Sequence, residues 1–322
     1  MANIEPLSET NIEIVLAILS EDHLSNIVLI ADCTQLRKWC DVRILTNNGS
    51  IDAIFSLYSD LAFLATAFWC RNVESLIEIM EDYSNLLVGK KFIAICTEDQ
   101  LNQFGEACVI LKPIKERQMI ADRTTELFCE CKQIPIRLTI DHADQLRELY
   151  RLSGTPAWTP NAMNLGPFFG IIEDDGTISA VAGVHYMTSY GTEIGNVATH
   201  PDHKRKGYAA ACIKAVVDDV LKTSGLVVLH YFDENTPAQR LYEKMGFKYS
   251  KADPVFFVQA TMFWLIILQI FREYQRCRYS SVNPILLYIV IALLFVLKTR
   301  SSDFVLPLRY PLLIRSNNNT VA

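Results

Sequence analysis

The residues best suited to chemistry lie between positions 193 and 247, where a basic, glycine-containing turn precedes an amphipathic stretch. The turn reads Lys204-Arg205-Lys206-Gly207-Tyr208-Ala209, and apolar residues then recur with helical spacing from Ile213 to Leu221. The first N–H groups of a helix lack intrahelical partners and carry partial positive charge. A phosphate group could therefore bind at this turn, close to the backbone of Gly207. A solvated basic loop entering an ordinary helix is the alternative.

A second strand–turn–helix unit follows the first. We expect a strand at Leu226–Phe232, a turn at Asn235 and a helix at residues 237–245 that carries Tyr242. The two units together resemble the GNAT superfamily of acetyl-CoA-dependent N-acetyltransferases. Lys204-x-x-Gly207-x-Ala209 is similar to the family's phosphate turn, Gln/Arg-x-x-Gly-x-Gly/Ala, with Lys at the first position. Residues 235–247 look like the family's closing motif, and the resemblance covers about residues 136–260.

The resemblance implies acetyl-CoA as the co-substrate. In the family, the strand before the phosphate turn separates from its neighbour and leaves N–H groups free for the acetyl carbonyl and the pantetheine arm. Gly195 and Asn196 suit such a bulge, although a normally paired strand is the alternative. The resemblance assigns acetyl-CoA contacts to Val197, Ala198, Thr199, Lys204, Arg205, Lys206, Gly207, Tyr208, Ala209, Ala210 and Asn235. Asn235 could equally cap the helix that follows it.

Acetyl transfer to an amine requires a proton acceptor for the amine, donors for the developing oxyanion, and a proton for the departing thiolate. The resemblance places Tyr242 near the thioester sulfur, as the general acid. Two family branches place their base at positions that correspond to Glu193 and to His230, and Glu193 is the slightly preferred candidate. Each of these side chains could instead serve packing or pair with a neighbouring group.

The resemblance implies a GNAT fold of the α/β (α+β) class, with a mixed, mostly antiparallel sheet flanked by helices. Trp158 and Phe168 lie where the family builds its acceptor pocket, but aromatic residues near prolines more often serve packing. Within residues 136–260 we expect strands at 136–140, 169–173, 179–186, 192–199 and 226–232, helices at 141–152 and 237–245, and a last hairpin near 247–258. Asp174-Asp175-Gly176 is a hairpin turn signal, and Asp141 is the expected cap of the first helix.

Residues 1–135 alternate between helical and strand-like patterns, and they are interpreted as a second α/β domain that resembles a degenerate half of a GNAT protein. The expected elements are a helix at 12–19, strands at 41–45, 51–58, 62–69 and 91–96, and a helix at 73–83 capped by Asn72. Asn47-Asn48-Gly49 would join two of the strands. No phosphate turn is found in this half, so its expected role is to support the fold and shape the acceptor site.

Composition limits the classes of function. The formal net charge is −6, and the excess of acidic residues lies before residue 255, which argues against a nucleic-acid partner. The nine cysteines are scattered and mostly lie in apolar runs, as is typical of reduced thiols in the cytoplasm. Neither they nor the six histidines form the spaced clusters of a metal site, so no metal is expected. The first residues lack the pattern of a signal peptide.

Residues 261–322 form a hydrophobic tail. Two apolar stretches, 255–271 and 284–297, are marginal in length for a bilayer span, which takes roughly 20 residues. The first overlaps the expected last strand, so a membrane segment at about 280–297 is the better candidate. A tail that packs on the domain or on another chain is the alternative.

The sequence therefore predicts an N-acetyltransferase that moves an acetyl group from acetyl-CoA to a primary amine of a small molecule, peptide or protein, by direct attack in a ternary complex. A non-catalytic CoA-binding regulatory module and a membrane-tethered interaction protein are the alternatives. The acceptor itself is not predicted, because variable loops build acceptor pockets.

Overall fold

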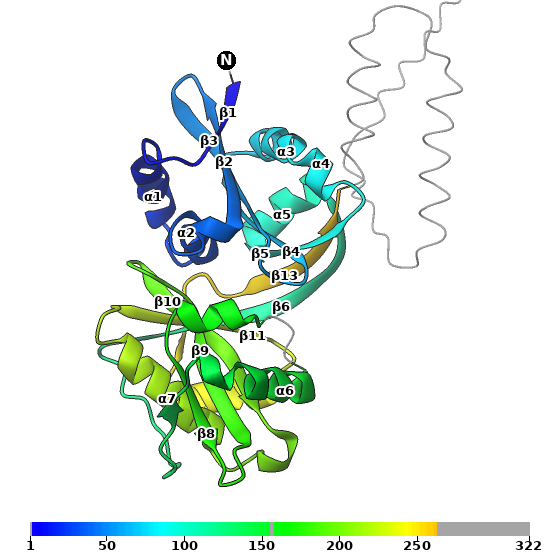
Figure 1. Ribbon diagram of the computed structural model, residues 1–322. Coiled ribbons are helices and arrows are strands. Elements are labelled where there is room, and N and C mark those ends of the chain that lie inside the picture. The colour runs from blue at the N-terminus through cyan, green and yellow to red at the C-terminus, as the bar shows by residue number, and fades with distance from the viewer. Residues whose placement is uncertain (1, 155–157, 263–322) are drawn as a thin grey trace, which may run out of the picture. The chain divides into compact units, whose positions relative to one another are not determined.

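The computed structural model describes residues 2–154 and 158–262 (Figure 1). The first half of the chain contains β1 (Ala2–Pro6), α1 (Ile12–Ser20), α2 (Ile27–Cys33), β2 (Cys40–Asn47), β3 (Ser50–Tyr58), β4 (Leu64–Cys70), α3 (Val73–Asp82), α4 (Ser84–Leu87), β5 (Lys91–Thr97), α5 (Glu98–Ala107) and β6 (Val109–Asp122). The second half contains β7 (Ile136–Arg137), α6 (Ala143–Ser153), β8 (Phe168–Ile172), β9 (Ile178–Thr188), β10 (Gly191–Thr199), α7 (Tyr208–Val220), β11 (Leu226–Phe232), α8 (Thr236–Met245), β12 (Lys248–Tyr249) and β13 (Val255–Thr261). Short 3-10 helices lie at Arg37–Trp39, Ile140–His142, Pro160–Asn164 and Pro201–His203.

The strands of the described residues join in one 13-stranded sheet, within one compact unit. Its order is β1-β2-β3-β4-β5-β13-β6-β11-β10-β9-β8-β7, and β12 pairs with β6 beside this path. Most neighbours are antiparallel, but β4 pairs with β5 and β10 with β11 in parallel. The sheet is therefore mixed, as expected.

The two halves of the chain exchange strands. β13, from the end of the second half, lies between β5 and β6 of the first half and is antiparallel to both (Figure 1). β6 in turn pairs with β11, so that Gln118 is opposite His230. The expected last hairpin near residues 247–258 is wrong, because β12 and β13 each pair with β6 rather than with each other. The division of the chain at residue 135 remains a prediction, and these pairings cross it.

Helices cover both faces of the sheet. In the first half, α3 and α5 pack on one set of strand residues, around Phe55 and Phe92, while α1 and α2 pack on the alternate set, around Ile44 and Ile54. In the second half, α7 and α8 share a core with alternating residues of β9 to β11, and α6 packs in a separate core. The period-two alternation of each strand thus supplies two apolar faces.

Local signals specify several of these elements. Asn48 and Gly49 both have positive φ (51° and 82°) and close the β2–β3 hairpin, as an Asn-Gly turn predicts. Asn72 accepts a hydrogen bond from the N–H of Ser75 and caps α3 as expected. The hairpin across residues 174–176 also forms, with β8 and β9 antiparallel.

Other local expectations are wrong in detail. The expected strand at 136–140 is reduced to Ile136–Arg137, because a 3-10 turn begins at Ile140. The following helix begins at Ala143 after His142, so Asp141 is not its cap.

Val255–Thr261, which overlaps one apolar stretch of the tail, forms the buried strand β13. Among the described residues no helix is both long and apolar enough to cross a bilayer, and the candidate segment at 280–297 lies outside them.

Candidate active site

The basic turn precedes α7 as predicted. Gly207 adopts a left-handed conformation (φ 78°) at the N-cap of this helix, and Arg205 also has a positive φ of 64°. Lys204, Arg205, Lys206 and Gly207 are exposed to solvent. An exposed helix N-terminus with a glycine at its cap and basic side chains beside it has the features of a phosphate site.

The segment after β6 passes against this turn. A Cβ atom added at Gly207 would lie 3.1 Å from Cβ of Cys131, so a side chain at position 207 would meet this segment. Cys131 itself is half-buried. Nothing in the sequence indicated that Cys131 borders the turn.

The strand before the turn, β10, separates from β11. The two strands pair only at Thr192 and Glu193, and β10 has an irregular register with β9 between Gly195 and Ala198. Asn196 lies in this bulge with a φ of 51°. From Gly195 to Thr199, no strand among the described residues pairs with the edge of β10 that would face β11. An N–H donor site for an acyl carbonyl requires such an unpaired edge.

α8 carries two of the predicted site residues. Asn235 accepts a hydrogen bond from the N–H of Ala238 at 3.2 Å, so it caps the helix. Tyr242 is buried against Tyr231 and Phe247, with ring centroids 5.5 and 5.8 Å away. Burial raises the pKa of Tyr242 to about 12, so its phenol keeps its proton near neutral pH and remains able to donate it.

Glu193 and His230, the two candidate bases, are brought together. His230 Nδ1 lies 3.2 Å from Glu193 Oε1, and His185 Nδ1 lies 3.1 Å from the same oxygen. The hydroxyl of Tyr186 donates a hydrogen bond to the other oxygen, Oε2. We call these four residues, Glu193, His185, Tyr186 and His230, the Glu193 cluster.

The cluster lies on β9, β10 and β11, where β10 begins to separate, and it receives a further residue from β6. Gln118 Nε2 lies 3.0 Å from His230 Nε2 and donates to the carbonyl of Leu24 at 3.1 Å. The hydroxyl of Ser250 donates to Gln118 Oε1. The first half of the chain therefore contributes directly to the candidate site.

Residues 126–247 match the model of the acetyltransferase (GNAT) family. The chain carries a GNAT acetyltransferase domain. No curated protein is significantly similar to the sequence.

Solved structures with a GNAT fold resemble the chain beyond this domain. A tandem GNAT protein from the clavulanic acid biosynthesis pathway matches with a TM-score of 0.56 at 10% identity, over 81% of this chain and 98% of that chain. A Drosophila protein matches with a TM-score of 0.63 at 13% identity, over 80% and 98% of the two chains. A GNAT-family acetyltransferase from Novosphingobium aromaticivorans matches with a TM-score of 0.52 at 19% identity, over 65% and 88%. At these identities the likeness shows the fold alone, which is the expected GNAT fold.

The electrostatics of the site distinguish two buried glutamates, Glu193 on β10 and Glu116 on β6. Burial acts to raise the pKa of Glu193, but His230 and His185 more than offset it and hold this pKa below its ordinary value. Burial raises the pKa of Glu116, on β6, to about 7, against the opposing effect of His230. Glu116 Oε2 is buried and has no hydrogen-bond partner among the described residues. Glu193 is thus a fully engaged carboxylate, whereas Glu116 can be either neutral or charged near neutral pH.

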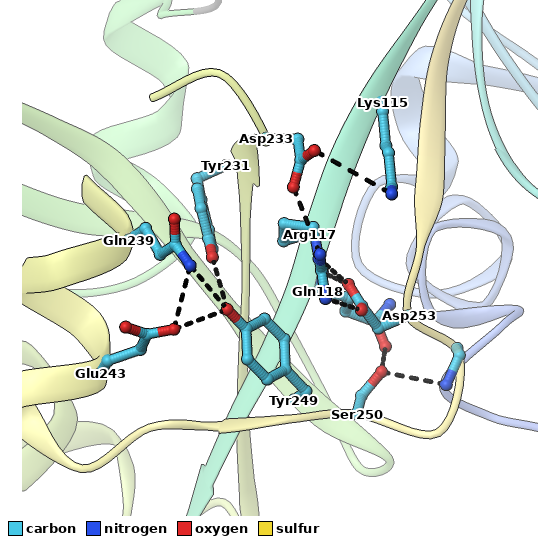
Figure 2. A network of polar contacts seen from close by, with 11 residues as sticks. Lys115, Arg117, Gln118, Tyr231, Asp233, Gln239, Glu243, Tyr249, Ser250 and Asp253 are labelled. Atoms are coloured by element: carbon cyan, nitrogen blue, oxygen red, sulfur yellow. Dashed lines mark hydrogen bonds and ion pairs between the residues drawn. The ribbon is translucent and has the colours of Figure 1, made fainter. Parts of the chain in front are cut away.

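A second polar network fastens β6 to the GNAT domain (Figure 2). Arg117 contacts both carboxylate oxygens of Asp253, at 3.0 and 2.6 Å, and Asp233 at 3.3 Å. Its guanidinium also lies over the ring of Tyr249, 4.5 Å from the centroid. The backbone N–H of Gln118 donates to Asp253 at 2.9 Å, which fixes the strand that carries the Gln118 side chain.

The remaining sequence candidates serve packing in this structure. Trp158 packs on Tyr150, with ring centroids 5.1 Å apart, and Phe168 is buried in the same core. Sequence reasoning missed His185, Tyr186 and Gln118. His185 interrupts the apolar strand β9, and this interruption is the one signal that could have indicated it.

Proposed function

We propose that the GNAT domain transfers an acetyl group from acetyl-CoA to a primary amine, by direct attack in a ternary complex. The observation that supports this proposal best is the position of Glu193 on β10, the strand whose open edge leads into the basic turn. Proton-transfer groups, free N–H donors and a phosphate site along one strand would together serve acetyl transfer.

We assign the roles from the family resemblance, and the described geometry is compatible with them. Gly207 and the N–H groups that follow it would hold the pyrophosphate, with Lys204, Arg205 and Lys206 providing positive charge. N–H groups of Val197 to Thr199 would receive the carbonyl oxygen and the pantetheine arm. Tyr242, whose pKa of about 12 keeps it protonated, would supply the proton to the thiolate. The Glu193 cluster would remove the proton from the amine.

Acetyl-CoA binding by the full chain, measured by calorimetry, tests the first part of the proposal. Gly207→Trp is the matched variant, because its side chain would fill the turn and meet Cys131. Binding by the wild type that is lost in Gly207→Trp would support the turn as the phosphate site, whereas no binding by the wild type would refute the proposal.

Turnover is then tested with acetyl-CoA and benzylamine, ethanolamine or a lysine-containing peptide, with the acetylated product detected by mass spectrometry. Binding without turnover would favour the regulatory module.

A further inference from the structure

Two histidines contact one carboxylate oxygen in the Glu193 cluster, but their surroundings differ. The side chain of His230 is 6% exposed, like that of Glu193, whereas the side chain of His185 is 33% exposed. A group that takes a proton from a substrate and passes it to water needs access to both. His185 meets this requirement better than His230.

The tautomer of His230 is fixed by its neighbours. The carbonyl of Leu24 can only accept, so the Gln118 atom beside it must be the amide nitrogen, and Ser250 donates to the amide oxygen. That nitrogen can only donate, so His230 Nε2 must accept its hydrogen bond. His230 therefore carries its hydrogen on Nδ1, toward Glu193, and has no free lone pair for a substrate proton.

His185 presents the same nitrogen to Glu193, but Gln118 contacts only Nε2 of His230. His185 Nδ1 lies 3.1 Å from Glu193 Oε1, so this nitrogen donates and the lone pair is left on Nε2. The imidazole lies against Gly195, where an added Cβ would be 2.7 Å from Nε2. Gly195 is the residue at which the bulge of β10 begins. The free nitrogen is thus held beside the open strand edge.

We propose that His185 is the residue that takes the proton from the acceptor amine, and that Glu193 is the positioning residue that orients it. The inference rests on the proposed function, because it assigns one step of that reaction. His230, held by Gln118, contacts the same carboxylate oxygen, and Tyr186 donates to the other one. The buried carboxylate thereby orients the imidazole and stabilises the imidazolium that forms, which is how carboxylates support histidine bases.

Protons and electrons balance over the proposed reaction. His185 Nε2 takes one proton from the ammonium group and later releases it to water. The free amine then attacks, forming the N–C bond as the carbonyl electron pair moves to oxygen. When the C–S bond breaks, the thiolate receives the proton of Tyr242, and the second proton lost by the nitrogen restores the phenol. The products are the N-acetylated amine, CoA and one proton.

Other titratable groups belong to the Glu193 cluster or act on it. They are Glu193 on β10, His230 on β11, Glu116 on β6 and Tyr186 on β9, with Asp32 of α2 acting on Tyr186. The test therefore compares variants at the two histidines, which share the same carboxylate, rather than relying on one pH profile.

The experiment measures kcat/KM for acetyl-CoA with benzylamine between pH 6 and 9, in the wild type, His185→Gln and His230→Gln. We expect His185→Gln to lose ~100-fold or more, the scale of general base catalysis. We expect the fold loss of kcat/KM in His230→Gln to be at least ten times smaller than that in His185→Gln. Acetyl-CoA affinity, from calorimetry, should change less than about threefold in both.

A weakly basic acceptor provides a readout that a purely structural role would not change. Methoxyamine is already neutral at pH 7, so its acetylation should be much less impaired in His185→Gln than that of benzylamine. Equal losses for both amines, or a larger loss in His230→Gln, would overturn the assignment of His185. A wild type that binds acetyl-CoA but acetylates neither amine nor the lysine-containing peptide would instead refute the proposed function, and this inference with it.

Discussion

The side-chain amide of Gln118 meets the imidazole of His230 across the β6–β11 pair, with 3.0 Å between the two Nε2 atoms. Gln118 is 1% exposed, and all of its polar side-chain atoms are engaged. A strand of the first half thus determines the hydrogen-bonding state of a histidine in the GNAT domain. The first half is part of the candidate site rather than a separate support.

This relationship predicts the effect of Gln118→Leu. The substitution retains the volume but leaves the carbonyl of Leu24 and Nε2 of His230 buried without partners, at a cost of roughly 1–3 kcal/mol each. We expect a decrease of that order in the free energy of unfolding, measured by urea denaturation. Gln133→Leu, at an exposed position, should change it by less than about 0.5 kcal/mol. Equal stability of the two variants would contradict the buried network.

The local features of the fold could be predicted because neighbouring residues determine them. The Asn48-Gly49 turn, the Asn72 cap and the turn at residues 174–176 each depend on a few consecutive residues. The glycine turn at 207 was predicted for the same reason, since its conformation is local, and phosphate binding there stays a prediction.

The role of β6 could not be predicted in this way. Its sequence mixes Lys, Glu, Arg and Gln with apolar residues, so it lacks the pattern of a buried strand. Its partners β11 and β13 follow more than a hundred residues later. Glu116 and Gln118 are buried only because of this non-local pairing. His185 was missed because its contact with Glu193 arises only when β9 and β10 pair, which the residue types alone do not indicate.

Tyr242→Phe should separate catalysis from binding. Loss of the phenolic proton donor is expected to reduce kcat by roughly 10²-fold or more, whereas acetyl-CoA affinity should be nearly unchanged. Steady-state kinetics and calorimetry on the same preparations would measure both. Tyr249→Phe is the control, since its hydroxyl contacts Glu243 at 2.8 Å on the protein surface. A kcat close to the wild-type value in Tyr242→Phe would exclude Tyr242 as the general acid.

Glu116 makes stability depend on pH. Its pKa is about 7 in the fold, against an ordinary value of 4.5, so the folded state favours the neutral carboxyl. Stability from this group is fully present below pH 4.5 and is lost as pH rises through 7. The difference between the two pKa values corresponds to a contribution of roughly 3 kcal/mol at most to the free energy of unfolding.

Glu116→Gln should remove this dependence, because glutamine stays neutral. We expect the variant to have a higher Tm than the wild type at pH 8 and a similar Tm at pH 4.5, by differential scanning calorimetry. Glu106→Gln, at an exposed position, should leave the difference between the two pH values unchanged. A lower Tm for Glu116→Gln at pH 8 would mean that the charged carboxylate stabilises the fold, contrary to the burial of its unpartnered oxygen.

Cys131 should report occupation of the basic turn. Its Cβ lies where a side chain at Gly207 would make contact, and the thiol is half-buried, so a pyrophosphate at the turn would restrict access to it. We expect acetyl-CoA to slow alkylation of Cys131 by iodoacetamide several-fold, as measured by mass spectrometry of the modified peptide. Cys70, half-buried in the first half of the chain beside Gln103, is the internal reference and should be unaffected. Protection of Cys131 that persists in Gly207→Trp, or equal protection of both thiols, would show that acetyl-CoA does not act at this turn.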